Sequence, residues 1–199
     1  MRLLIVVFIA GIVTFGSGLL SKTLTTRTLS DANSVYDDFV ITESSWLYSD
    51  TIGSAAASDV ERAKIALGGP LGLSSKEAVY FIATSDNKGD ALVSSCDYRV
   101  SGTPIDTRWW SLTLYDTQTQ HYVPNEINRS SWNSASIPRD EYGNWTIEVS
   151  QSEKSGAWLP TQSDDDKTFE LNLRIYNPSD ATRAILPDIS VPVVEKTSC

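Results

Sequence analysis

An alternation of apolar and polar residues dominates the sequence downstream of residue 77, and it constrains the fold more than any other feature. The stretch FELNLRIY, residues 169–176, places its four large apolar side chains on one side, as expected for a strand with one buried face. The stretches WSLTLYD and WTIEV repeat the pattern and point Trp110 and Trp145 inward. Several such strands, separated by Gly, Pro and Asn turns, predict a mainly β domain at residues 71–199, a jelly-roll-like antiparallel β-sandwich.

The first 22 residues predict a membrane anchor. No charged residue lies between Arg2 and Lys22, and about 20 apolar residues suffice to cross the hydrocarbon core of a bilayer. We therefore expect a transmembrane signal anchor at residues 1–22, which contacts the membrane through residues 3–21. A cleaved signal peptide is the alternative, although the small residues of a cleavage site are sparse here.

Residues 23–70 lack the strand pattern and predict a stalk with short helices. The segment is rich in Ser, Thr, Ala and Asp, and its apolar spacing is only loosely helical. Ser58 and Glu61 have the spacing of a capping box, and Gly68 is suited to end the helix that this box begins.

The chain contains two cysteines, Cys96 and Cys199. An even number in an exported chain predicts a disulfide, and closing a loop of about 100 residues stabilises a fold by roughly 4 to 5 kcal/mol. One buried thiol and one free thiol are the alternative, because two cysteines are a weak pattern. Neither interpretation predicts a metal site, since zinc usually needs three or four ligands and the chain offers two thiols and one histidine.

The composition and motifs argue against nucleic acid and against the common catalytic classes. The 16 basic and 25 acidic residues give a net charge of −9, which is the wrong sign for neutralising phosphates. The sequence contains no G-x-S-x-G elbow, P-loop, G-x-G-x-x-G or H-E-x-x-H motif. We predict no cofactor and no metal, and the missing motifs favour a protein without enzymatic activity over an enzyme.

The polar segment VPNEINRSSWN, residues 123–133, is the main candidate for a site. Asn125 and Asn128 suit a chain reversal after a core strand, since their side chains can bond the local backbone. Arg129 is less easily explained, because its five donors seek a carboxylate, several carbonyls or a ligand. The segment therefore predicts either a structural clamp or a ligand contact.

Exposed aromatic residues extend this candidate set. Adjacent strand residues face opposite sides, so an inward Trp110 makes Trp109 point outward or under another layer. Trp109, Trp132 and Trp158 are suited to stack against a ligand. His121 is the single histidine, so any histidine base would have to be this residue, but an ordinary polar surface position at a hairpin tip or strand edge is the favoured explanation.

Four stretches together resemble the family known as domain of unknown function 1214: RWWSLTLYD, YVPNEINRSSWN, AWLP and LNLRIYNP. The upstream stretches SDVERAKIALGGPLGLSSKEAVYFIA and CDYRVSG resemble its short, membrane-anchored bacterial members. The resemblance implies a jelly-roll domain, placed in the periplasm and anchored in the bacterial inner membrane. It also implies a partner from the sister family, domain of unknown function 1254, and it strengthens the expectation of a bond between Cys96 and Cys199, because those members tend to end in cysteine.

Two function classes follow from these observations. The first is a non-catalytic interaction or ligand-binding module of the cell envelope, favoured by the anchor, the acidic composition and the missing catalytic set. The second is an envelope enzyme, such as a carbohydrate-active hydrolase, that uses Asp or Glu carboxylates in a Trp-lined cleft.

Overall fold

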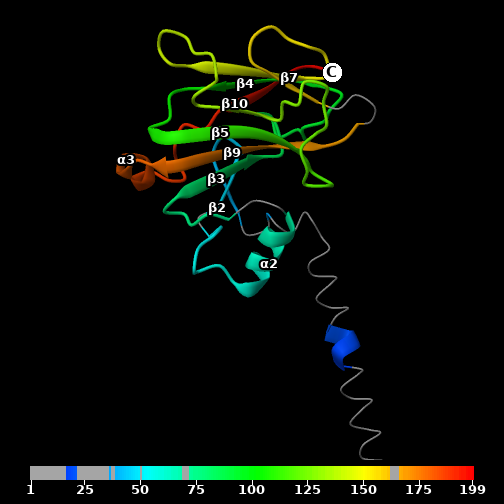
Figure 1. Ribbon diagram of the computed structural model, residues 1–199, viewed down its shortest axis with the longest axis vertical. Coiled ribbons are helices and arrows are strands. Elements are labelled where there is room, and N and C mark those ends of the chain that lie inside the picture. The colour runs from blue at the N-terminus through cyan, green and yellow to red at the C-terminus, as the bar shows by residue number, and fades with distance from the viewer. Residues whose placement is uncertain (1–16, 22–35, 37–38, 50, 69–71, 162–165) are drawn as a thin grey trace, which may run out of the picture.

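The computed structural model describes residues 17–21, 36, 39–49, 51–68, 72–161 and 166–199. Its strands form two sheets that lie face to face, with the four-stranded sheet above the six-stranded sheet in Figure 1. The six-stranded sheet contains, in spatial order, β1 (Val40–Ile41), β2 (Leu47–Ser49), β3 (Ala78–Ala83), β9 (Phe169–Pro178), β5 (Thr107–Asp116) and β6 (Ser131–Asn133). The four-stranded sheet contains β10 (Val193–Ser198), β4 (Asp97–Gly102), β7 (Trp145–Ser150) and β8 (Trp158–Pro160). The prediction of a mainly β fold with antiparallel sheets is confirmed.

One strand pair departs from the antiparallel arrangement. β8 runs parallel to β7, because the connection at residues 151–157 returns the chain to the level of Glu148, which lies opposite Trp158 in the second half of β7. All the other strand pairs among the described residues are antiparallel. β9 lies in the middle of its sheet, between β3 and β5, so the two longest strands, β5 and β9, are direct neighbours.

The main core fills the space between the two sheets. Its largest contribution from β9 is the alternating set that the sequence predicts: Phe169, Leu171, Leu173 and Ile175, each at most 2% exposed. Trp110 on β5 packs against Trp145 on β7, with ring centroids 4.6 Å apart, so the predicted inward direction of both indoles is confirmed. Gly102 is required beside this pair, because an added Cβ would lie 2.2 Å from the Trp145 ring.

Two indole N–H groups link the sheets at opposite sides of the sandwich. The Nε1 of Trp46, just before β2, donates to the Pro192 carbonyl just before β10, at 2.7 Å. The Nε1 of Trp132 on β6 donates to the Trp158 carbonyl on β8, at 3.0 Å. Since β2 and β10 lie toward one side and β6 and β8 toward the other, both sides of the core are closed by a hydrogen bond between sheets.

The six-stranded sheet carries a second layer on the face turned away from the core. In Figure 1 helix α2 (Asp59–Gly68) lies below this sheet, and the short helix α3 (Asp180–Ala184) lies at its end. α2 begins at the predicted capping box, because the Ser58 N–H donates to Glu61 Oε2 at 2.6 Å and the Glu61 N–H donates to Ser58 Oγ at 3.2 Å. Ile65 of α2 packs with Tyr80 of β3 in a small apolar cluster on this outer face.

The predicted disulfide between Cys96 and Cys199 is present, and it joins two positions at a sequence separation of 103. Cys96 is 5% exposed and directly precedes β4, whereas Cys199 follows β10. The bond therefore joins the ends of two strands that already pair in the four-stranded sheet. The alternative of two unpaired thiols is wrong.

The structure tests only part of the predictions for the anchor and the stalk at the N-terminus. The predicted anchor at residues 1–22 lies outside the described residues except for 17–21, which are helical, and no helix among the described residues is long and apolar enough to span a membrane. The predicted stalk at 23–70 is not confirmed as a stalk, because β1 and β2 belong to the six-stranded sheet and Trp46 is 1% exposed in the main core. Burial of this indole holds residues 40–49 against the sandwich.

Candidate ligand-binding site on the outer face of the six-stranded sheet

The loop after β5 satisfies its own backbone through Asn125. The Asn125 Nδ2 donates to the carbonyls of Val123 at 3.0 Å and Arg129 at 2.9 Å, and its Oδ1 accepts from the Arg129 N–H at 2.8 Å. Asn128 has a φ of +51°, a left-handed conformation that asparagine tolerates better than most residues. Within this loop, the asparagines act as a structural clamp of the chain reversal.

Arg129 lies against an aromatic face. Its guanidinium carbon lies 4.1 Å from the centroid of Trp132, a distance at which a cation is attracted by the ring. Trp132 in turn is held by its hydrogen bond to the Trp158 carbonyl, and the Trp158 Nε1 donates to the Ser150 carbonyl at 3.1 Å. Packing against Trp132 accounts for the position of the Arg129 guanidinium. The contact between Arg129 and a ligand stays a prediction.

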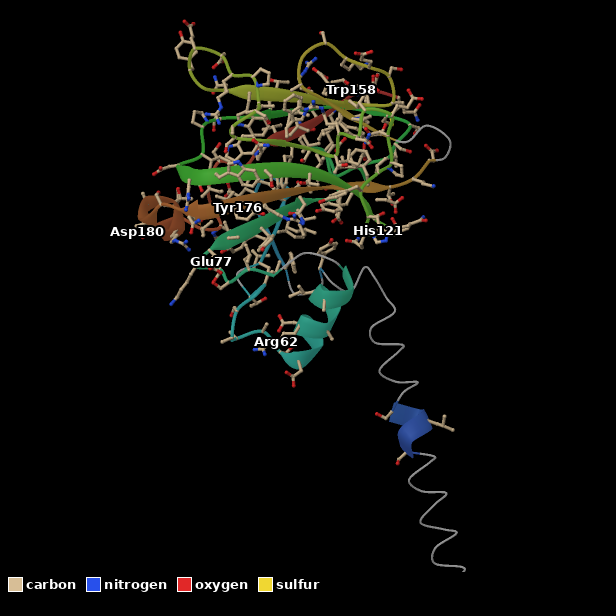
Figure 2. All side chains as sticks on the ribbon, in the orientation of Figure 1. Arg62, Glu77, His121, Trp158, Tyr176 and Asp180 are labelled. Carbon is tan, nitrogen blue, oxygen red and sulfur yellow. A yellow bond between two sulfur atoms is a disulfide. The ribbon has the colours of Figure 1, made fainter. Side chains whose placement is uncertain are left out.

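The other two candidates lie elsewhere. Trp109 faces outward as predicted and packs against Tyr176, with ring centroids 5.0 Å apart. His121 is exposed, and its carbonyl accepts from the Asp116 N–H at 2.9 Å at the end of β5. Figure 2 shows Tyr176 and His121 at opposite ends of the six-stranded sheet and Trp158 on the other sheet. The seven candidate residues therefore do not form one site.

A different set of polar residues meets on the outer face of the six-stranded sheet. Glu170, Asn172 and Arg174 alternate along β9 with the core residues, so all three point away from the core. Their partners on β5 are also polar: Tyr115 lies opposite Glu170, Thr113 opposite Asn172 and Ser111 opposite Arg174. We call these six residues the polar strip. A strip of this kind is ordinary when it faces water, but Glu170 is only 2% exposed and Asn172 only 3%.

Glu170 is the acidic residue of this strip and lies at the opposite end from Arg174. Its Oε2 accepts a hydrogen bond from the Tyr36 hydroxyl at 2.8 Å, and the Gln120 side chain supplies a second hydrogen bond. Burial raises the pKa of Glu170 from 4.5 to about 7, although these two bonds and the Arg174 charge act in the opposite direction. Burial and the neighbouring carboxylate also raise the pKa of Tyr36, so its hydroxyl keeps its proton and stays a donor.

A cavity of about 360 Å³ opens beside the Glu170 carboxyl. Its lining combines three apolar side chains, four hydroxyls, one amide and one carboxyl: Leu47, Ala91, Phe169, Tyr36, Thr84, Thr117, Thr168, Gln120 and Glu170. This volume lies at the lower end of the range for small-molecule sites, and a mainly neutral lining with few polar groups is typical of them. We call it the Glu170 cavity.

Two further atoms of the polar strip are buried without a hydrogen-bond partner among the described residues. These atoms are Asn172 Oδ1 and Arg174 Nε. The Nη2 of Arg174 donates to the Tyr115 hydroxyl at 2.8 Å, and burial raises the pKa of Tyr115 to about 12. Leaving a buried polar atom unpaired costs about 1 to 3 kcal/mol. The packing of the sheet therefore does not explain why these polar side chains are in the strip.

The raised pKa of Glu170 predicts a pH-dependent stability. A carboxyl with a pKa of about 7 in the folded state and 4.5 in the unfolded state holds its proton more tightly when folded. The stabilisation is therefore complete below pH 4.5 and is lost as the pH rises toward 7, with a total of about 3 kcal/mol.

Glu170→Gln is expected to remove this dependence in urea unfolding measured at several pH values. Glu148→Gln, on the other sheet and paired with Arg99, should retain it; equal pH profiles for wild type and Glu170→Gln would contradict the assignment.

Sequence reasoning missed this site for a physical reason. The alternation in FELNLRIY correctly separates the two faces of β9, but a polar face is normally read as facing solvent. Tyr36 lies 134 residues from Glu170 along the chain, and no local pattern brings them together. The one available signal was the concentration of Glu, Asn and Arg on one face of the strand at the centre of the sheet.

The fold and the cavity define a two-sheet β protein with one buried carboxyl on the outer face of its larger sheet. The chain belongs to the family described as "Protein of unknown function (DUF1214)", whose model matches residues 77–180. The match contains β9 with Glu170 but ends upstream of β10, and it begins after Tyr36. The predicted family resemblance is thereby confirmed.

Two solved structures are similar to this chain. The VPA0106 protein from Vibrio parahaemolyticus shares 27% sequence identity at a TM-score of 0.57, over 70% of this chain and 36% of that protein. An uncharacterized protein from Burkholderia cenocepacia shares 12% identity at a TM-score of 0.44, over 87% of this chain and 40% of that protein. The chain thus spans well under half the length of either structure. No match was found among curated proteins.

Proposed function

We propose that the protein is a non-catalytic binding module that takes a small ligand in the Glu170 cavity. The observation that carries this proposal is the coincidence of a cavity of about 360 Å³ with a carboxyl that is only 2% exposed. A buried carboxyl is destabilising unless it is paired, so its retention beside a cavity is more easily explained by a ligand than by the fold.

An enzyme remains the second candidate because of one observation. A carboxyl with a pKa of about 7 is suited to give and take a proton at neutral pH. However, glycoside hydrolysis uses two carboxyls about 5 to 9.5 Å apart. Among the described residues that line the cavity, Glu170 is the single carboxyl, and none is a tryptophan. The binding module is therefore the better supported proposal.

We further propose the setting in which the module works. Residues 1–22 anchor the chain in the bacterial inner membrane and the jelly-roll domain lies in the periplasm, a placement supported by the apolar N-terminal stretch and the disulfide. A protein of the sister family, domain of unknown function 1254, is the proposed partner on the family resemblance. Crosslinking in the native envelope tests this, and recovery of the chain alone would count against it.

Blocking the cavity tests the binding proposal. Ala91 is exposed and lines the cavity, so Ala91→Trp is expected to fill its mouth without disturbing the core. The probes are n-butylammonium, n-butanol and butyrate, which share a four-carbon chain and differ in charge. In ¹H–¹⁵N NMR titrations at pH 8, at least one probe is expected to shift the amide resonances of Gln120 and Thr168 in the wild type, and this shift should disappear in Ala91→Trp.

The matched control is Ala135→Trp. Ala135 is equally an exposed alanine, but it follows β6 near Trp110, away from the Glu170 end of β5. The control should keep the wild-type titration. If none of the three probes shifts the cavity resonances in the wild type, or if both tryptophan variants lose the shift equally, the cavity is not a ligand site.

A further inference from the structure

We infer that the ligand of the Glu170 cavity is a small organic cation, a protonated amine with an apolar portion, whose ammonium group pairs with the Glu170 carboxylate. This inference rests on the proposed binding function and names the chemical class that the cavity selects. Four features support it. They are the charge of the lining, the capacity of the Glu170 carboxylate for further hydrogen bonds, the incomplete compensation of its negative charge, and the apolar residues that line the cavity.

Glu170 is the one carboxyl among the described residues of the lining, none of which is cationic, and the Tyr36 hydroxyl keeps its proton. Among the described lining residues, Glu170 carries the charge at neutral pH, while hydroxyls, an amide and apolar groups make up the rest. Arg174, the cation whose charge acts on Glu170, is not a lining residue and donates instead to the Tyr115 hydroxyl. An anionic ligand would meet an unbalanced carboxylate in a partly enclosed space, and this repulsion is only weakly screened.

The Glu170 carboxylate has capacity for further donors. A carboxylate offers about four lone-pair sites, whereas the described neighbours supply two side-chain hydrogen bonds, from Tyr36 and Gln120. An ammonium group brings three donors and no acceptor. Thr117 and Thr168 line the same cavity as Glu170, and their hydroxyls, which bond to each other, keep lone pairs that can accept from the remaining ammonium donors.

The neighbours of Glu170 compensate its negative charge incompletely. The titratable or charged groups that face it are Tyr36, its cross-strand partner Tyr115, and Arg174 on its own strand. Arg174 is the one cation of the three, and burial still raises the pKa of Glu170 to about 7. A ligand cation in the cavity would supply the missing charge, because buried charges are stable only when paired.

The apolar residues of the cavity favour a ligand that carries a short hydrocarbon chain in addition to its ammonium group. Leu47 and Ala91 line it together with Phe169, whose ring belongs to the main core, so a short hydrocarbon chain has apolar residues to contact. A volume of about 360 Å³ holds a small molecule and excludes a folded partner. A four-carbon primary amine is therefore a suitable probe of the class.

The pairing makes affinity depend on pH in a defined direction. The ammonium of n-butylammonium stays protonated between pH 5 and 8, whereas the carboxyl is ionised for about 1% of molecules at pH 5 and about 90% at pH 8, given its pKa of about 7. Affinity scales with the ionised fraction, so the dissociation constant at pH 5 should be roughly two orders of magnitude higher than at pH 8.

The test titrates n-butylammonium, n-butanol and butyrate separately at pH 5 and pH 8, followed by NMR of the cavity amides. The expected result is tightest binding by n-butylammonium at pH 8, with the predicted loss at pH 5. Glu170→Gln should abolish this preference and its pH dependence, whereas Glu148→Gln should keep both. Tyr36→Phe, which removes one donor to the carboxylate, should move the midpoint of the pH dependence upward.

The outcomes separate the two proposals. If butyrate or n-butanol binds in the cavity more tightly than n-butylammonium, the amine assignment is overturned and the binding module stands. If n-butylammonium binds with the same affinity at pH 5 and pH 8, pairing with Glu170 is likewise overturned. If no probe shifts the cavity resonances, the proposed binding function itself fails.

Discussion

Replacing Cys199 with alanine is expected to lower the free energy of unfolding by about 4 to 5 kcal/mol. The bond to Cys96 closes a loop with a sequence separation of 103 residues, and in the chain-entropy description such a crosslink stabilises mainly by restricting the unfolded chain. Cys199 is exposed, so its side chain contributes little packing of its own. The loss should appear in urea unfolding as a lower midpoint together with a larger denaturant dependence, since the unfolded chain expands.

Two comparisons isolate the crosslink. Ser198→Ala changes the neighbouring residue of the same strand end and should leave the midpoint nearly unchanged. Cys96→Ala should cost more than Cys199→Ala, because Cys96 is 5% exposed and its removal also leaves a small packing defect. Wild-type unfolding midpoints that are identical with and without a reductant would contradict this account of the disulfide.

Replacing Trp46 with alanine is expected to destabilise the protein by about 3 to 5 kcal/mol, the range for removing a large buried aromatic side chain. Trp46 is 1% exposed and belongs to the main core, although it lies in the segment just before the short strand β2. Its loss would detach β1 and β2 from the sheet edge as well as leave a cavity. Chemical unfolding followed by the fluorescence of the remaining tryptophans gives the size of the effect.

The phenylalanine variant separates packing from hydrogen bonding. Trp46→Phe keeps an aromatic ring but leaves the Pro192 carbonyl without its indole donor, which should cost about 1 to 3 kcal/mol. Trp132→Phe removes the equivalent donor to Trp158 on the opposite side, where the contact is only partly buried, and should cost less. Equal losses for the two phenylalanine variants would show that burial of these hydrogen bonds does not govern their contribution.

The main sheets could be predicted from the sequence because their strands are long enough to show a period. The alternation along β9 and the stretch around Trp110 gave the correct inward faces, and the Ser58 to Glu61 spacing gave the start of α2. β1 and β2 could not be found this way, because strands of two and three residues show no period. Their attachment depends on Trp46, which contacts Pro192 from 146 residues away in the sequence.

The site was harder to predict than the fold because its residues come from distant segments. Asn125 was recognised from its turn chemistry, and the structure explains it locally. Glu170 interacts with Tyr36, which lies 134 residues away in the sequence, and with Gln120, which lies in the turn after β5. Local periodicity identifies which side of a strand a residue takes, but it does not reveal whether another layer covers that side.

The position of β9 at the centre of the larger sheet has a consequence for biosynthesis. β3 and β5 leave the ribosome well before β9, yet neither can pair across the centre of the sheet until residues 169–178 arrive between them. During elongation both strands therefore present unpaired edges to other nascent chains. Completion of the six-stranded sheet is therefore confined to the last stage of synthesis or later.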